Sequence, residues 1–335
     1  MDFSLLYSEF PSLTFDGVAL GAIYALISLG YTLVYGVLRL INFAHSEVFM
    51  IGTFAALVSA ERVMGIAVED DPITGWKLYL TIIVCLMIAM IASGLTAVMI
   101  ELIAYRRLRK RGASKLASLI SAIGVSITLV EFFRIITNAL PREFPRFLDK
   151  TFIADIFGAQ IRNDKVLVII AACVMMFVLD RFISRTRIGK GIRAVSQDER
   201  TAILMGLNIN RVVSATFLMG GLMAGAAAFF YVLVYENTSF RVGFFLGISA
   251  FTAAVLGGIG NIRGALVGGF VLGLLEIYGA ALFGTAWKNV ISFTILLLVL
   301  LLRPTGLLGE SIQQDRKSTR LNSSHEWISR MPSSA

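Results

Sequence analysis

The chain has 335 residues, of which 57% are hydrophobic and only 16% are charged, and its mean hydropathy is +0.79. A soluble fold of this size needs about a quarter of its residues charged to cover its surface. The composition therefore excludes a soluble enzyme, a disordered chain and a secreted disulfide scaffold, and it predicts an integral membrane protein. The formal charge of +8 then reports the topology of the loops, and we expect no nucleic-acid partner.

Nine apolar segments can cross about 30 Å of hydrocarbon at about 1.5 Å of rise per helical residue. They are residues 15–38, 46–60, 78–105, 116–137, 166–183, 212–235, 245–259, 265–283 and 289–302. Segments 46–60, 245–259 and 289–302 are near 15 residues long, so we expect them to be short, re-entrant or broken helices. The predicted fold class is an all-α polytopic membrane protein with eight or nine transmembrane helices.

Loop charge orients these spans. One connection is basic throughout (residues 106–115), and a second, 181–211, carries seven Lys and Arg residues opposed by Asp198 and Glu199. Residues 61–77 are net negative, and residues 141–165 are nearly balanced. The positive-inside rule predicts that both basic connections are cytoplasmic, that the N-terminus is outside and that the C-terminus is inside. An odd number of crossings satisfies both ends, so nine is the preferred count.

Three parts of the chain follow from this topology. Residues 1–14 carry Asp2 and Glu9 and no basic residue, so we expect an extracytoplasmic segment rather than a cleaved signal peptide. Residues 15–309 form the predicted transmembrane domain, and 310–335 form a tail. Within the tail, residues 317–335 resemble a translated adaptor or vector sequence. Setting aside Lys317, Arg320 and Arg330 together with Glu326 lowers the formal charge from +8 to +6.

The second basic connection contains a candidate docking segment, GKGIRAVSQDERTAILMGLNIN at residues 189–210. Residues 198–205 can form two helical turns, and Gly206 supplies a stop. Ala202, Ile203 and Met205 are apolar in a loop that we place in the cytoplasm, so they need a surface to pack on. Docking to a cytoplasmic partner is the preferred interpretation, and a solvated or membrane-lying helix is the alternative.

Polar and glycine-rich motifs interrupt the apolar segments. The cluster at 41–47 either caps a helix or lines a gate at a helix break, and its candidate residues are Asn42, Phe43, His45, Ser46 and Glu47. A second candidate for a pathway or helix break contains Gly257, Gly258, Gly260 and Asn261. Glycines four residues apart, such as Gly17 and Gly21, favour close helix packing, with a translocation path or a subunit seam as the alternative.

The sequence lacks the residues that several kinds of catalytic and cofactor site require. No GxxxxGK[ST] phosphate loop occurs, and one histidine (once the tail is set aside) with two separated cysteines cannot form an ordinary zinc or haem site. We therefore expect no catalytic centre and no metal or cofactor on this chain. Glu276 is the clearest ionisable residue in mid-span, with Glu101 and Glu131 nearer span ends, which gives weak support to ion-coupled transport.

Four motifs in order resemble one family. INFAHSE (41–47), LISAIGVS (119–126), AVLGGIGNIRGALVGG (254–269) and RPTGLLG (303–309) resemble permeases of branched-chain amino acid ABC transporters, specifically the shorter of the two paired subunits. The resemblance extends from about residue 17 to 309, and it departs at Ser46, where the family usually has glycine. Residues 184–211 resemble the ATPase-coupling loop of these permeases, which assigns that role to Gly191, Arg193, Asp198, Glu199, Ala202, Met205 and Gly206.

The resemblance implies an importer in which this chain forms half of the translocation pathway in the bacterial inner membrane. It further implies a second homologous permease, two cytoplasmic ATPase subunits that bind ATP and Mg²⁺, and a periplasmic substrate-binding protein. Leucine, isoleucine and valine are the expected cargo. A related branch that carries urea or short amides is the alternative, and an ion-coupled secondary transporter is a further rival.

Overall fold

The computed structural model describes residues 9–156, 159–303 and 305–309. Most of the predicted N-terminal segment and the whole of the predicted 310–335 tail lie outside the described residues. The helical elements are α2 (Phe10–Leu38), α3 (His45–Val58) with η1 (Ser59–Val63), α4 (Trp76–Ile100) with η2 (Glu101–Tyr105) and α5 (Arg106–Lys110), α6 (Lys115–Ile136), α7 (Asn163–Arg185), α8 (Arg187–Gln197), α9 (Glu199–Leu204), α10 (Ile209–Tyr235), α11 (Val242–Gly257), α12 (Ile262–Phe283), η3 (Thr285–Trp287) and α13 (Lys288–Leu302).

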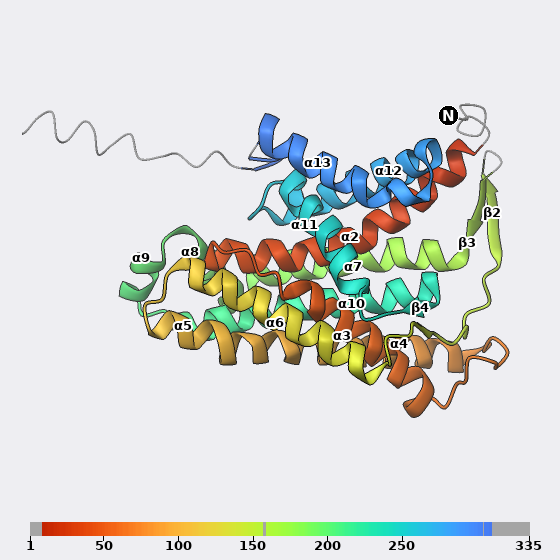
Figure 1. Cartoon of the computed structure of the whole chain (residues 1–335), viewed down its shortest axis with the longest axis horizontal. Helices are drawn as coiled ribbons and strands as arrows, with labels where there is room; N and C mark the ends of the chain where they lie inside the picture. Colours follow the sequence, from red (N-terminus) through yellow and green to blue (C-terminus); the bar gives the residue numbers. More distant parts are fainter. Residues whose placement is uncertain (1–8, 157–158, 304, 310–335) are drawn as a thin grey trace, which may run out of the picture.

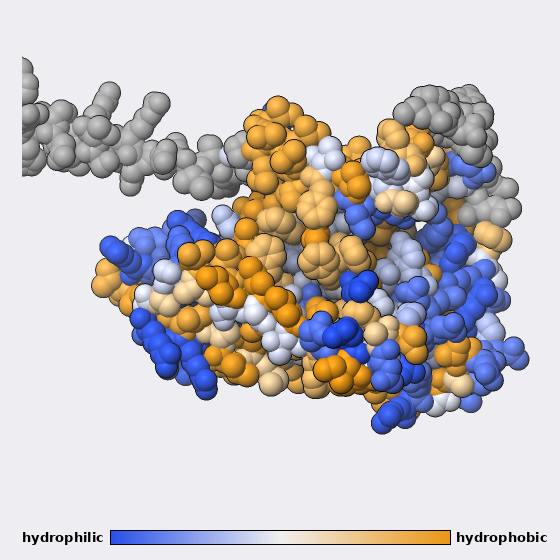
Figure 2. Space-filling view, viewed as in Figure 1, coloured by the Kyte–Doolittle hydropathy of each residue, from blue (hydrophilic) through white to orange (hydrophobic). Residues whose placement is uncertain are grey.

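The predicted helical membrane fold is confirmed. Within the described residues, seven helices are long and apolar enough to cross a membrane, and α11 is a shorter apolar helix. The remaining predicted span, 46–60, coincides with α3, which continues through the π-helical turn η1. The face shown in Figure 2 is largely apolar between its two ends, and polar residues gather mainly at those ends.

Three local predictions differ from the structure. Helix α2 begins at Phe10 rather than at residue 15, because Pro11 lies in the first turn, where a missing backbone N–H costs nothing. The loop predicted at 189–210 contains an additional helix, α8, which begins where the Thr186 hydroxyl accepts a hydrogen bond from the Gly189 N–H.

The third difference is a small amount of β-structure, which the all-α prediction omitted. Strand β1 (Arg142–Glu143) pairs antiparallel with β4 (Asn237–Thr238), and β2 (Phe152–Ile156) pairs antiparallel with β3 (Ala159–Arg162). Backbone groups in a loop of this length need hydrogen-bond partners, and these short pairs supply some of them.

Helix α2 is the centre of the bundle. It crosses the molecule between α11–α13 on one side and α3, α4 and α6 on the other, and it packs on α12, α10, α11 and α7 (Figure 1). Within its most apolar window 94% of the residues are buried, whereas the corresponding window of α6 is only 11% buried. The protein therefore encloses most of α2, and α6 lies at the periphery.

Glycines allow the central helices to touch backbone to backbone. A Cβ atom at Gly21 would lie 2.8 Å from the Phe270 Cα atom and 2.9 Å from the Gly269 carbonyl oxygen. A Cβ at Gly269 would lie 2.6 Å from the Ala25 Cα atom. Because lipid supplies no hydrophobic force between helices, this close van der Waals contact is a main source of association for α2 and α12.

The two basic connections lie at one end of the molecule, and the N-terminal end of α2 lies at the other (Figure 1). Arg263 at the start of α12 is 3.9 Å from the Asp180 carboxylate near the end of α7, so the α11–α12 turn belongs to the basic end. The last described residues return to this turn, since Leu307 and Leu308 donate backbone hydrogen bonds to Leu256 and Gly257.

A matched pair of substitutions in α2 tests the glycine contact. Gly21→Ala should lower the free energy of unfolding by ~1–3 kcal/mol, because the new methyl group meets the backbone of α12. Gly36→Ala in the same helix meets no atom within 4 Å, and its stability should stay equal or rise. Thermal unfolding in detergent measures both, and an equal melting temperature for the two variants would show that the contact is loose.

Candidate functional site

The α8–α9 segment projects from the basic end of the bundle. Asp198 caps the start of α9, and its carboxylate accepts a hydrogen bond from the Arg200 N–H at 2.9 Å. Ala202 faces inward and is 3% exposed, whereas Leu204 and Met205 are 86% and 79% exposed. Large apolar side chains exposed next to charged ones are typical of an interaction surface.

Asp198 holds the start of α9 in place. Hydrogen bonds from the Thr201 hydroxyl, and then from the backbone N–H groups of Thr201 and Arg200, lower the pKa of this exposed carboxyl below its ordinary value. The carboxylate is therefore ionised at neutral pH, where it also interacts favourably with the positive end of the short helix.

The segment is joined firmly to α10. Gly206 has a φ of +83°, which ends α9 in the left-handed region, and Leu207 donates a backbone hydrogen bond to the Ala202 carbonyl at 3.1 Å. The side chain of Asn208 then accepts from the Arg211 N–H and caps α10. Only a few residues separate the two helices, so a short, hydrogen-bonded turn connects α9 with α10.

Helix α8 is tied to α2. Arg39 ends α2 with a φ of 51°, and its guanidinium donates to the Ser196 and Gln197 carbonyl oxygens at 3.2 Å each. These carbonyls are among the last of α8, where a cation is favoured by the helix dipole. Gly191 is buried against Val212 of α10, and Arg193 donates to the Ser184 hydroxyl at 2.9 Å.

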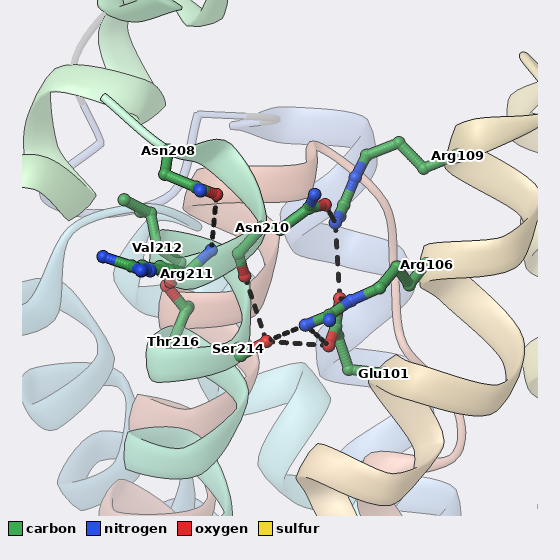
Figure 3. A network of polar contacts seen from close by, with 9 residues as sticks. All are labelled: Glu101, Arg106, Arg109, Asn208, Asn210, Arg211, Val212, Ser214 and Thr216. Atoms are coloured by element: carbon green, nitrogen blue, oxygen red, sulfur yellow. Dashed lines mark hydrogen bonds and ion pairs between the residues drawn. The ribbon is translucent and has the colours of Figure 1, made fainter. Parts of the chain in front are cut away.

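A buried ion-pair network links α10 to the end of α4 (Figure 3). The Glu101 side chain is 0% exposed and accepts from the guanidinium groups of Arg106 at 2.9 Å and Arg109 at 3.3 Å. Ser214 of α10 donates to Glu101 at 2.8 Å, and the Asn210 side chain accepts from Arg109 at 2.7 Å. Glu101 begins the π-helical turn η2, which places both arginines on its own side.

On the flank of the bundle, a cavity of about 880 Å³ opens between α2, α3, α6, α11 and α13. Its lining includes six phenylalanines: Phe43, Phe240, Phe244, Phe245, Phe251 and Phe293. Helix α6 contributes residues at helical spacing: Ile123, Ser126, Ile127, Val130, Glu131 and Arg134. The cavity is thus mainly apolar, with a few polar groups at defined places.

The 41–47 cluster divides between this cavity and the core. Phe43 and Ser46 line the cavity, while Glu47 is buried directly behind Ser46. His45 is 1% exposed and packs edge-on against Tyr31, with ring centroids 4.7 Å apart. Asn42 is 3% exposed, and its side-chain oxygen accepts from the Tyr105 hydroxyl at 2.9 Å.

The second predicted cluster lies apart from the cavity, at the α11–α12 turn. The Asn261 side chain caps α12 by accepting from Arg263 and Gly264, and it donates to the Leu308 carbonyl oxygen at 2.8 Å. Gly258 and Gly260 have φ values of +105° and +100°, and Gly257 packs against the Gly264 backbone. These four residues break the chain between two helices.

Glu276 lies in the core with its hydrogen bonds made. Both of its oxygens lie 3.0 Å from the Tyr24 hydroxyl, and Ser292 donates to it at 2.9 Å, which connects α12 with α2 and α13. Among the described residues, no group of three or more His, Cys, Asp or Glu side chains is placed to hold a metal ion.

Several participants were not singled out by the sequence. Arg106 and Arg109 entered only as loop charges, and Asn210, Ser214 and Ser126 received no role. The sequence does hold a signal for the network, because Glu101 lies five residues before Arg106 and because Asn210 and Ser214 share one helix face. Ser126 faces the cavity only because α6 packs beside α3, which its sequence does not reveal.

Known proteins resemble the chain over most of its length. The family model described as branched-chain amino acid transport system / permease component matches residues 13–300. This chain is 38% identical to each of two high-affinity branched-chain amino acid transport system permease proteins, BraD of Pseudomonas aeruginosa and LivH of Escherichia coli K12. Each match covers 88% of this chain and 94% of the relative. A probable branched-chain amino acid transport permease protein LivH of Methanocaldococcus jannaschii is 26% identical over 85% of this chain and 88% of the relative.

The enclosed helical bundle, the membrane-length helices and the apolar cavity define a polytopic membrane transport permease. The chain belongs to the branched-chain amino acid transport system / permease component family, since the family model and relatives of high coverage agree. The resemblance seen in the four sequence motifs is thereby confirmed.

Removing the buried carboxylate tests the network. Glu101→Gln leaves Arg106 and Arg109 without their countercharge and should lower the free energy of unfolding by about 3 kcal/mol. Glu131→Gln removes a half-exposed partner of Arg134 and should cost at most about 1 kcal/mol. Thermal unfolding of the two purified variants compares them, and equal shifts would contradict a special role for the buried pairs.

Proposed function

We propose that this chain is a transmembrane permease subunit of an ATP-driven ABC importer for branched-chain amino acids. It forms half of the translocation pathway and couples to ATPase subunits that bind ATP and Mg²⁺. The observation that carries the proposal is the whole-length similarity to permease proteins of branched-chain amino acid transport systems. The cavity and the α8–α9 segment supply a physical basis for cargo and for coupling.

The cavity suits an apolar cargo. Six phenylalanines in its lining offer dispersion contacts to a branched aliphatic side chain, and they favour leucine, isoleucine or valine over urea or a short amide. A second, homologous permease subunit would close the open side and complete the pathway. A periplasmic binding protein would deliver the cargo.

The α8–α9 segment suits an ATPase partner. Ile203, Leu204 and Met205 are exposed together at the basic end, which the positive-inside rule places in the cytoplasm. Two ATPase subunits that close on ATP would move this surface as a rigid body. The motion would pass to α10 through the Asn208 cap, and then to α4 through Ser214, Asn210 and Glu101.

The same assignment supports a location and an orientation, which we propose as follows. The protein lies in the bacterial inner membrane with the N-terminus in the periplasm and the C-terminus in the cytoplasm. Membrane lipid covers the outer apolar faces of helices such as α6 and α13, whose large side chains are exposed.

Co-purification tests the assembly. The tagged chain, solubilised in mild detergent from its own host, should bring along two ATPase subunits and a second permease, and the purified complex should hydrolyse ATP. A single-chain species that transports leucine in vesicles without these partners would contradict the proposal and favour an ion-coupled transporter.

A substitution at Gly206 tests the coupling role. Gly206→Val places a β-branched residue at a φ of +83°, where only glycine is relaxed, so α9 should shift relative to α10. We expect ATP hydrolysis to continue while leucine uptake per ATP falls by about tenfold or more, as in a loss of about 1.4 kcal/mol of coupling.

Gly65→Val is the matched control, because Gly65 also has a positive φ (+68°) and open surroundings but lies beyond η1, remote from α9 in the chain. Its ratio of uptake to hydrolysis in reconstituted vesicles should match the wild type. A wild-type ratio for Gly206→Val as well would refute the coupling assignment.

A further inference from the structure

We propose that Ser46, Ser126 and Glu47 form a binding site for the α-ammonium group of the cargo on one wall of the cavity. The inference rests on the proposed function, since it assigns a chemical role inside the same cavity. Ser46 of α3 and Ser126 of α6 both line the cavity, and their hydroxyl oxygens each lie 3.1 Å from the Oε1 atom of Glu47.

With their hydrogens directed at Glu47, the two hydroxyl groups are available to accept a hydrogen bond from a ligand. Each serine carries a single hydroxyl hydrogen. The Ser126 hydroxyl donates its hydrogen to Glu47, and the Ser46 hydroxyl shares its hydrogen between Glu47 and the Phe43 carbonyl oxygen, which is 2.6 Å away. The lone pairs that remain on both oxygens suit an ammonium donor and exclude a carboxylate.

Glu47 places a carboxyl group behind the two hydroxyls, and a cation bound there would hold that group in its ionised form. The residue is 0% exposed, and no described residue lies within ion-pair distance of its carboxyl group. Its Oε2 atom has no hydrogen-bond partner among the described residues. A buried carboxyl without a countercharge is costly to keep in a membrane protein and marks a functional position. A cationic ligand at the hydroxyls would supply that countercharge.

Packing holds the carboxyl group in this position. Gly243 and Gly247 of α11 face Glu47 and Ser46, and a Cβ atom at Gly243 would lie 2.9 Å from the Glu47 Oε2 atom. A Cβ at Gly247 would collide with the Ser46 side chain. The two glycines therefore bring α11 close enough to keep Glu47 directed at Ser46 and Ser126.

The other charged groups of the cavity do not offer a rival ammonium site. Glu131 is paired with Arg134 at 2.6 Å, so its charge is already balanced. Arg241 lies over the Phe240 ring at 5.2 Å from its centroid and carries positive charge itself. The cavity thus has hydrogen-bond acceptors at Ser46, Ser126 and Glu47 on one wall and the cationic groups of Arg134 and Arg241 elsewhere, a pattern that suits a zwitterionic amino acid with an apolar side chain.

Competition binding with fragments of leucine tests the site. The complete complex in lipid nanodiscs, without the binding protein, is titrated with radiolabelled leucine and displaced by 3-methylbutylamine, which lacks the carboxylate, or by 4-methylpentanoate, which lacks the ammonium. The wild type should bind leucine. The substitutions Ser126→Ala and Glu47→Gln should each lower the affinity for leucine and for the amine by about tenfold, the usual effect of losing a charged hydrogen bond. The affinity for the acid should stay the same in both variants.

Glu61→Gln is the control, because it removes an exposed carboxylate that is not in the cavity lining, and its displacement curves should follow the wild type. Ser126→Ala keeps the test valid if Glu47→Gln fails to fold, since Ser126 is partly exposed on α6. Absence of leucine binding to the wild type, or equal losses for the amine and the acid, would overturn the inference.

The same preparations separate this inference from the proposed function. ATP-driven leucine uptake by the reconstituted wild-type complex tests the function alone. If the wild type takes up leucine and the amine displaces leucine equally well in both variants, the importer assignment is retained and the ammonium site is refuted. Absence of uptake with any cargo would remove the function.

Discussion

Helices α2 and α12 approach each other at Gly21, Gly269 and Gly273 until backbone meets backbone. Lipid provides no hydrophobic force for helix association, so this contact must come from close packing, which only small residues permit. Together with α10, α11 and α7 on its other sides, this contact buries most of α2. Tyr31 on α2 lines the cavity, and Arg39 at its end holds the last carbonyls of α8. One central helix thus touches both candidate functional regions.

Polar contacts then connect these regions across the bundle. Glu101 joins the end of α4 to α10, and α10 continues from α9 through the Asn208 cap. Helix α4 packs on α3, which carries Ser46 and Glu47 to the cavity. A displacement that begins at the exposed residues of α9 therefore has a continuous path of buried ion pairs and packed helices to the cavity wall. The chain has no phosphate loop in its sequence, so the proposed response to ATP would have to reach it from a partner along these contacts.

Much of this could be predicted from the sequence, because its signals are local. Each predicted apolar span is helical, and Asp198 and Gly206 bound α9 as their capping preferences indicate. The sequence does not predict helix α8, because two of its four buried residues are glycines, which are typical of loops. The role of Ser126 depends on α6 lying beside α3, and the α11–α12 turn turned out to lie away from the cavity. Both are tertiary facts that a single sequence does not encode locally.

The most direct test of the account is the energy source of transport. The complete complex is reconstituted into vesicles, and uptake of radiolabelled leucine is measured with and without ATP inside and with and without binding protein outside. The account predicts accumulation only when ATP, the ATPase subunits and the binding protein are all present. Accumulation by this chain without ATPase subunits, driven by an ion gradient, would contradict it.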